Sequence, residues 1–141
     1  MATASTSYRL DAGLKHRLAA QANEEGITET ALVTRMLEEG LRTARFPGIV
    51  FRDGPSGRRP SLNGGPDVVE VMVGVRYAVG RGEAKVRDAA EQMGLPERLI
   101  RLAIDYASAY PEEMEERIAR YEAALEEAKA MAEQRARLLA S

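Results

Sequence analysis

The side chains that could carry acid–base chemistry are a single histidine and a run of carboxylates near the last quarter of the chain. His16 lies between Leu14 and Leu18, and the sequence has no cysteine and no second histidine to act with it. The glutamates of residues 112–116 follow a proline at the expected start of a helix, where they would be solvated rather than convergent. We therefore expect no catalysis by this chain alone.

The sequence also contains no motif typical of a phosphate-binding loop or of a metal site. No GxxxxGK[ST] loop is present, and the short glycine groups at 64–65 and 80–82 do not follow a strand into a helix. With no cysteine and one histidine, little remains from which to build a zinc site. The sequence therefore predicts neither a cofactor nor a metal.

Composition places the chain among ordinary folded proteins. Hydrophobic residues make up 45% and charged residues 30% of 141 positions, which is enough for one domain or two very small ones. The net charge is −2, so any nucleic-acid site must be local rather than a general basic surface. Residues 1–45 hold six basic and six acidic side chains, and residues 111–141 hold five and eight.

The location of the protein is predicted from what the sequence lacks. The N-terminus does not have the basic-then-apolar pattern of an export signal, and nowhere do ~18 apolar residues follow one another. The absence of cysteine fits a reducing compartment. We expect a cytoplasmic protein with no membrane contact.

The first third of the chain predicts a strand followed by two short helices. In residues 5–10, Tyr8 and Leu10 alternate with the polar Ser5, Ser7 and Arg9, which is the pattern of a strand. Asp11 and Gly26 predict the two ends of a helix over 12–25. Thr28 predicts the start of a helix over 29–44 with an apolar face. These elements are too small to close a core, so they require a partner.

This order of elements, with the motifs Tyr8-Arg-Leu-Asp11 and Gly26-Ile-Thr-Glu-Thr30, resembles the ribbon-helix-helix family of DNA-binding proteins. The resemblance covers residues 1–45. It implies an intertwined homodimer in which paired strands enter the major groove of double-stranded operator DNA. The dimer core would be formed by Tyr8, Leu10, Leu14, Leu18, Leu32 and Met36.

The same resemblance implies the DNA contacts. The outward residues Ser5, Ser7 and Arg9 would face base edges, where a guanidinium can bridge O6 and N7 of guanine. Thr28 and Thr30 would present amides and hydroxyls to a phosphate at the start of the second helix. The plainer alternative is that residues 5–10 form only a surface strand or a frayed terminus, and that Thr28 is only a helix cap.

Residues 46–110 predict a small helical module with a hairpin. Short strands are expected over 48–51 and 59–62, and helices over 68–79, 83–93 and 97–109, with Asp67 able to cap the first of these helices. Ala90, Gly94 and Ile100 have the spacing of a helix-turn-helix, which would place Glu97, Arg98 and Arg101 on a recognition helix. Any tight helical hairpin satisfies this loose pattern, and nearby acidic residues oppose DNA binding.

The motifs Phe46-Pro-Gly-Ile-Val50, Gly57-Arg-Arg59, Gly65-Pro-Asp-Val-Val-Glu-Val71 and Leu95-Pro-Glu97 are similar to a small domain of some bacterial antitoxins paired with PIN-domain ribonucleases. This second resemblance is more diffuse than the first. It implies an antitoxin with a DNA-binding end and a toxin-binding end. The alternative is a domain with a purely structural role.

Residues 111–141 predict one long helix with a narrow apolar stripe. The stripe repeats at alternating four- and three-residue steps through Met114, Ile118, Tyr121, Leu125 and Ala128, and these five are the predicted toxin-binding residues. The same stripe could instead pack on the chain's own domain or on a second copy of the helix.

Together these patterns predict a mainly α protein: an N-terminal ribbon-helix-helix over 1–45, a hairpin-containing helical module over 46–110, and a long helix over 111–141. The function we expect is that of an antitoxin that represses its own operon and neutralises a toxin. A repressor acting without a toxin is the main alternative, and a scaffold whose strand pairs with another protein is a third.

Overall fold

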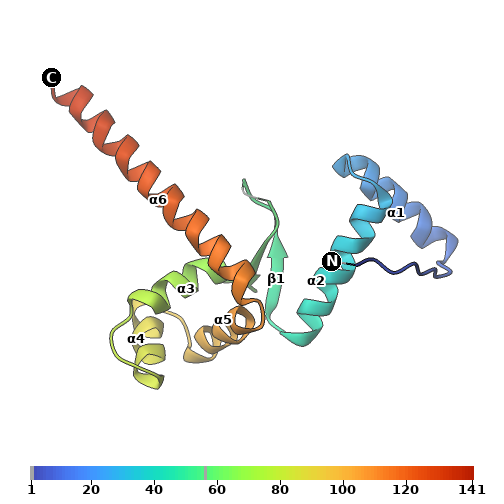
Figure 1. Cartoon of the computed structure of the whole chain (residues 1–141), viewed down its shortest axis with the longest axis horizontal. Coiled ribbons are helices and arrows are strands. Elements are labelled where there is room, and N and C mark those ends of the chain that lie inside the picture. The colour runs from blue at the N-terminus through green and yellow to red at the C-terminus, as the bar shows by residue number, and fades with distance from the viewer. Residues whose placement is uncertain (1, 56) are drawn as a thin grey trace. The chain divides into compact units, whose positions relative to one another are not determined.

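The computed structural model describes residues 2–55 and 57–141 and divides the chain into two compact units, Met1–Arg42 and Thr43–Ser141. We call these the N-terminal unit and the C-terminal unit. In the described residues the chain forms six helices and one two-stranded hairpin (Figure 1).

Two helices, α1 (Ala12–Glu25) and α2 (Glu29–Arg45), make up most of the N-terminal unit. The Asp11 carboxylate caps α1 by accepting from the backbone N–H groups of Gly13 and Leu14 at 3.0 and 3.2 Å. Gly26 ends α1 with φ +69°, a left-handed conformation that glycine adopts without steric cost. Thr28 Oγ1 then accepts from the Ala31 N–H at 3.0 Å. The predicted limits and caps of both helices are confirmed to within one residue.

The predicted N-terminal strand is wrong. Residues 2–10 have no regular secondary structure, and the first element of the chain is the helix α1, so the β-α-α order of a ribbon-helix-helix is not what this chain forms. The physical reason is that alternation of side chains does not make a strand. A strand needs a neighbour for its backbone N–H and C=O groups, and no strand or bridge in the described part of the chain pairs with residues 2–10.

The C-terminal unit begins with the hairpin of β1 (Ile49–Arg52) and β2 (Arg59–Leu62), which pair antiparallel with Ile49 opposite Leu62. Three helices follow, α3 (Val68–Tyr77), α4 (Glu83–Met93) and α5 (Glu97–Ala109). The final helix, α6 (Pro111–Ala140), starts with a proline at its first turn, where the missing N–H has no intrahelical acceptor. The hairpin and all four helices were predicted within a few residues of these limits.

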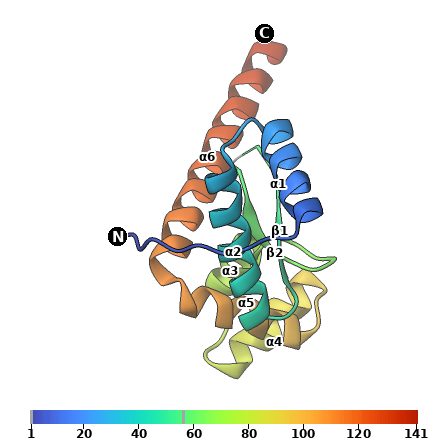
Figure 2. The ribbon, with the colours of Figure 1, turned by 90° about the vertical axis from the view of Figure 1, so that its right-hand side faces the viewer.

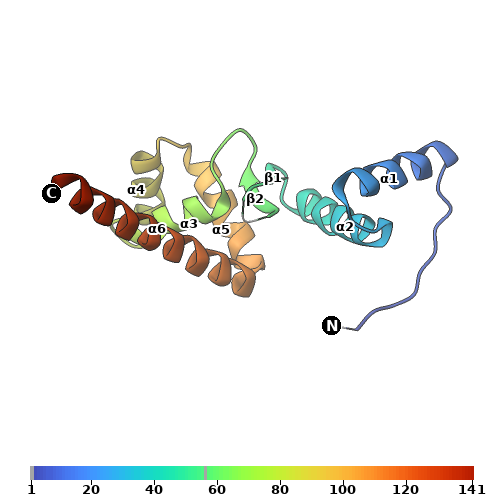
Figure 3. The ribbon, with the colours of Figure 1, turned by 90° about the horizontal axis from the view of Figure 1, so that it is seen from above.

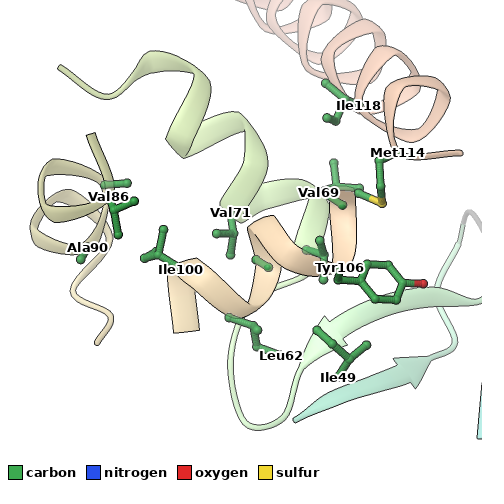
Figure 4. Close-up of a cluster of buried hydrophobic side chains, with 14 residues drawn as sticks. Ile49, Leu62, Val69, Val71, Val86, Ala90, Ile100, Tyr106, Met114 and Ile118 are labelled. Carbon is green, nitrogen blue, oxygen red and sulfur yellow. The ribbon is translucent and has the colours of Figure 1, made fainter. Parts of the chain in front are cut away.

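One core holds the C-terminal unit together. Its buried side chains come from the hairpin and from all four helices, and they are drawn as sticks in Figure 4. Tyr106 of α5 is fully buried at its centre, with its ring 5.5 Å from that of Phe46 and 4.9 Å from that of Tyr110. Burial of a side chain of this size contributes about 1.5–3 kcal/mol or more to folding.

The long helix α6 is covered by the unit only along its first third. Met114 and Ile118 are buried in the core, whereas every residue from 123 to 141 is exposed. Figure 2 shows the end of α6 on the opposite side of the C-terminal unit from α4 and α5, and Figure 3 shows α6 leaving from the side of the hairpin. The described residues of the C-terminal unit therefore do not bury any of the last five turns of α6.

Candidate nucleic-acid and partner-binding surfaces

A groove runs between the two helices of the N-terminal unit, and four of the predicted dimer-core residues line it. These are Leu14 and Leu18 of α1 and Leu32 and Met36 of α2. Leu32 is fully buried, Leu18 is half-buried, and Leu14 and Met36 are 42% and 54% exposed. Only Ala22 joins Leu32 as a buried apolar residue of these helices. The unit thus has an apolar face but very little core.

A second groove lies beside the N-terminal segment. The segment contributes Ala4, Thr6, Tyr8 and Leu10, and α2 contributes Val33 and Leu37 among others. Ser5 and Thr30 line this groove too, whereas Ser7 and Arg9 do not. Tyr8 and Leu10, which were predicted to face the dimer core, thus lie on the α2 side of the segment, but both are exposed. Ser7 and Arg9, which were predicted to face DNA, lie outside this groove.

The predicted DNA-contacting residues are accessible in this unit. Ser5, Ser7, Arg9, Thr28 and Thr30 are all exposed. Thr28 has the role of a helix cap, because its Oγ1 accepts from the Ala31 N–H at the start of α2. The cap and the predicted phosphate contact do not exclude each other, because a hydroxyl that accepts one hydrogen bond can still donate another.

Two ion pairs fix the angle between α1 and α2. Lys15 Nζ lies 2.7 Å from a carboxylate oxygen of Glu29, and Arg35 Nη1 lies 2.7 Å from Glu25 Oε1. Both pairs are partly exposed, so each contributes on the order of 0–1 kcal/mol. They orient the helices but do not replace the missing core.

The helix-turn-helix pattern of residues 90–100 corresponds to the real junction of α4 and α5. Ala90 and Ile100 are buried between the helices, and Gly94 ends α4 with φ +64°. Arg101, however, is bound to the carboxylates of Glu83 and Glu97, and hydrogen bonding to Glu83 raises the pKa of its guanidinium. A guanidinium that is already bound to two carboxylates is poorly suited to bind DNA, because those carboxylates repel the phosphates.

The predicted toxin-binding residues divide into two groups. Met114 and Ile118 are buried by the chain's own C-terminal unit, and Tyr121 is half-buried. Leu125 and Ala128 are exposed, and the apolar surface continues along α6 to Leu139. A partner that binds α6 without unfolding the C-terminal unit therefore contacts only the part of the stripe that starts near Leu125.

The alternating spacing missed some exposed apolar residues that lie beside the predicted ones. Met131 and Leu138 are each 68% exposed on the free end of α6, and Ile27 is exposed in the turn between α1 and α2. At about 100° per residue these two side chains lie roughly 100–120° around the helix from the predicted stripe, so neither a 3.5- nor a 3.6-residue period would have included them. Leu37 and Leu41, which the sequence predicts on the apolar face of α2, are exposed as well.

Across residues 2–55 and 57–141, no three His, Cys, Asp or Glu side chains are arranged to hold a metal ion. Within the same residues, none of the helices combines the length and the apolar character that crossing a bilayer requires. Compared with family models, with curated proteins and with solved structures, the chain has no match.

Proposed function

We propose that this protein is an antitoxin-type regulator that binds operator DNA through its N-terminal unit, as a homodimer, and a partner toxin through the free end of α6. The toxin we expect is a ribonuclease of the PIN-domain kind. The observation that carries this proposal is the exposed apolar surface of the N-terminal unit and of the free end of α6, which the core of the C-terminal unit does not include.

The N-terminal end supports the homodimer. Two helices with Ala22 and Leu32 as their buried apolar residues cannot offset the entropy of ordering the unit, which needs a larger core. The exposed side chains of Leu14, Met36, Leu37 and Leu41 would supply that core when a second copy covers them. The N-terminal unit has none of the acidic excess that marks the final helix, so its approach to DNA meets less repulsion.

The C-terminal end supports a protein partner. Most of the stability of helices in proteins comes from packing of an apolar face rather than from helix propensity. The free end of α6 carries Leu125, Met131, Leu138 and Leu139, which the described residues of the C-terminal unit leave exposed. A helix laid in a groove of another protein is a common mode of recognition and would supply the missing contacts.

Substitution of one arginine in each candidate DNA-binding element tests the DNA contact. We expect the wild-type protein to bind a DNA fragment from upstream of its own gene, with an affinity that falls steeply as salt rises. Arg9→Ala should weaken that binding roughly 5- to 150-fold, equivalent to about 1–3 kcal/mol for one base contact. Arg101→Ala is the matched control and should bind as the wild type does.

The outcomes separate the alternatives. Loss of DNA binding with Arg101→Ala but not with Arg9→Ala would show that the DNA contact lies at the α4–α5 junction. If neither the wild type nor the two variants bind DNA in a salt-sensitive way, the protein is a scaffold that binds other proteins only. DNA binding without any toxin partner would leave a repressor acting alone.

A further inference from the structure

A cavity of about 170 Å³ opens at the point where α6 leaves the core of the C-terminal unit. Its walls come from β2, from the start of α3 and from α6. The side chains that line it are Arg59, Asp67, Val69, Arg117, Arg120 and Tyr121, together with Ala124. None of these residues was singled out for the DNA contact, and only Tyr121 belongs to the predicted toxin-binding stripe.

The charge of this lining is positive, because three guanidinium groups face one carboxylate. That carboxylate is already engaged: Asp67 Oδ2 lies 2.5 Å from Arg59 Nε, and Asp67 Oδ1 accepts from Ser61 Oγ at 2.6 Å. The bond to Ser61 and Arg59 also explains why Asp67, predicted to cap α3, occupies the cap position but makes no side-chain capping bond. Asp67 therefore neutralises Arg59 and leaves the other two guanidiniums.

Arg117 and Arg120 have acidic neighbours that are too distant to hydrogen-bond. Arg117 Nε lies 3.7 Å from Glu113 Oε2, and Arg120 Nη2 lies 3.9 Å from Glu116 Oε1, with both glutamates outside the lining. At these distances the pairs are electrostatic contacts rather than hydrogen bonds. Neither glutamate therefore accepts a hydrogen bond from Arg117 or Arg120 across these distances.

One donor of these two guanidiniums is buried without an acceptor. Arg117 Nη1 donates to the backbone oxygen of Arg58 at 3.2 Å, which fixes the guanidinium in place. Its Nε is buried and donates no hydrogen bond to any residue that the structure describes. A buried unsatisfied donor costs about 1–3 kcal/mol, more when charged, and commonly marks the place of a missing water or ion.

The remaining wall is apolar and carries one hydroxyl. Val69 and Ala124 contribute carbon surface beside the half-buried ring of Tyr121. Burial raises the pKa of the Tyr121 phenol, and the negative charges of Glu70 and Asp67 raise it further. The phenol is therefore neutral at physiological pH and can donate to an oxyanion.

We propose that this cavity is a binding site for a small organic anion. Its phosphate or carboxylate group would accept from Arg117 and Arg120, and its carbon part would lie against Val69, Tyr121 and Ala124. An engineered apolar cavity of about 150 Å³ holds one benzene molecule, so a ligand of about one ring fits. Planar guanidiniums match both oxyanions in geometry, and their pairing with either is charge-assisted.

Such a ligand would contact β2, the start of α3 and the N-terminal half of α6 together, because the lining residues come from all three elements. Binding would thereby hold the first turns of α6 against the unit. The inference does not depend on the proposed function, since it concerns a site within one copy of the chain.

Calorimetric titration of the full-length protein with phenyl phosphate, benzoate and inorganic phosphate, at constant ionic strength, tests the site. We expect saturable binding of at least one of the two organic anions, and the preferred one identifies the oxyanion. Arg120→Gln is the main variant because its side chain is 59% exposed and its loss leaves the fold intact. It should weaken binding about 10-fold or more, as expected for a lost charge-assisted bond.

Arg117→Lys and Arg101→Gln complete the design. Arg117→Lys keeps the charge but removes the planar donor pair, so it should also weaken binding about 10-fold. Arg101→Gln removes a guanidinium of α5 outside the cavity and should bind as the wild type does. The proposal is overturned if no probe binds saturably, or if Arg120→Gln and Arg101→Gln bind equally well.

Discussion

Arg76 of α3 donates to Glu122 of α6 at 2.9 Å, and Glu122 is the last residue of α6 that the C-terminal unit covers. This ion pair marks the boundary between two parts of one helix. Before it, α6 packs into the core through Met114 and Ile118; after it, every residue of the helix is exposed, although Ala124 still lines the cavity beside α3. The two parts should therefore differ in what they contribute to folding.

Removal of residues 123–141 should leave the stability of the C-terminal unit almost unchanged, within about 0.5 kcal/mol, because no buried contact is lost. Met114→Ala should lower its free energy of unfolding by about 2–5 kcal/mol, since it leaves a cavity in the core. Urea denaturation followed by circular dichroism measures both. Equal destabilisation by the two changes would mean that the free end of α6 packs on the unit in solution.

Met36→Glu should convert the protein from a dimer to a monomer and reduce its helix content, because it places a charge in the exposed apolar groove of the N-terminal unit. Leu138→Glu, which changes an equally apolar residue on α6, is the control and should remain dimeric. Light scattering coupled to gel filtration gives the mass of each. A dimeric Met36→Glu protein would place the self-association elsewhere.

Alanine substitutions at Gly48 and Gly94 distinguish the cost of backbone strain from the cost of a steric clash. Both have positive φ, +103° and +64°, but a Cβ at Gly48 would lie 2.8 Å from Leu102 Cδ2, whereas a Cβ at Gly94 meets no described atom within 4 Å. Gly94→Ala should cost about 1 kcal/mol and Gly48→Ala roughly 2–3 kcal/mol in thermal or urea unfolding. A smaller cost at Gly48 would show that Leu102 and the β1 turn relax freely.

The raised pKa of Tyr121 predicts how stability falls at high pH. The folded state holds the phenolic proton more tightly than the unfolded state, whose pKa is about 10, so this contribution is complete below about pH 10. It is lost as the pH rises through the folded pKa. Tyr121→Phe should therefore flatten the stability curve above about pH 10, and Tyr77→Phe, at an exposed position, should not. Identical curves for wild type and Tyr121→Phe would contradict the assignment.

Much of the fold follows from local signals in the sequence. Asp11, Gly26, Thr28, Gly94 and Pro111 each mark a helix end by a mechanism that acts within a few residues, and the structure places helix ends at all five. The prediction of a strand over residues 5–10 was wrong because a strand depends on pairing with a neighbouring strand, which a local sequence pattern does not specify.

The candidate sites were predicted less well, because they depend on contacts between distant residues. Periodicity marked Met114, Ile118 and Leu125 as one stripe but could not indicate that the unit covers the first two and not the third. The cavity brings Arg59 beside Arg117 across 58 positions of sequence, and no sequence pattern links the two residues. Burial and the geometry of tertiary contacts, rather than residue types, define these sites.

The central claim is that one chain binds DNA at its N-terminal unit and a toxin at the free end of α6. The most direct test is co-expression with the product of the adjacent reading frame, using the full chain and a chain ending at residue 122, followed by co-purification and a growth assay. We predict that the full chain forms a stable complex and restores growth, whereas the shortened chain folds, still binds DNA and does neither. Equal rescue by both chains, or an adjacent product that is neither toxic nor bound, would contradict the claim.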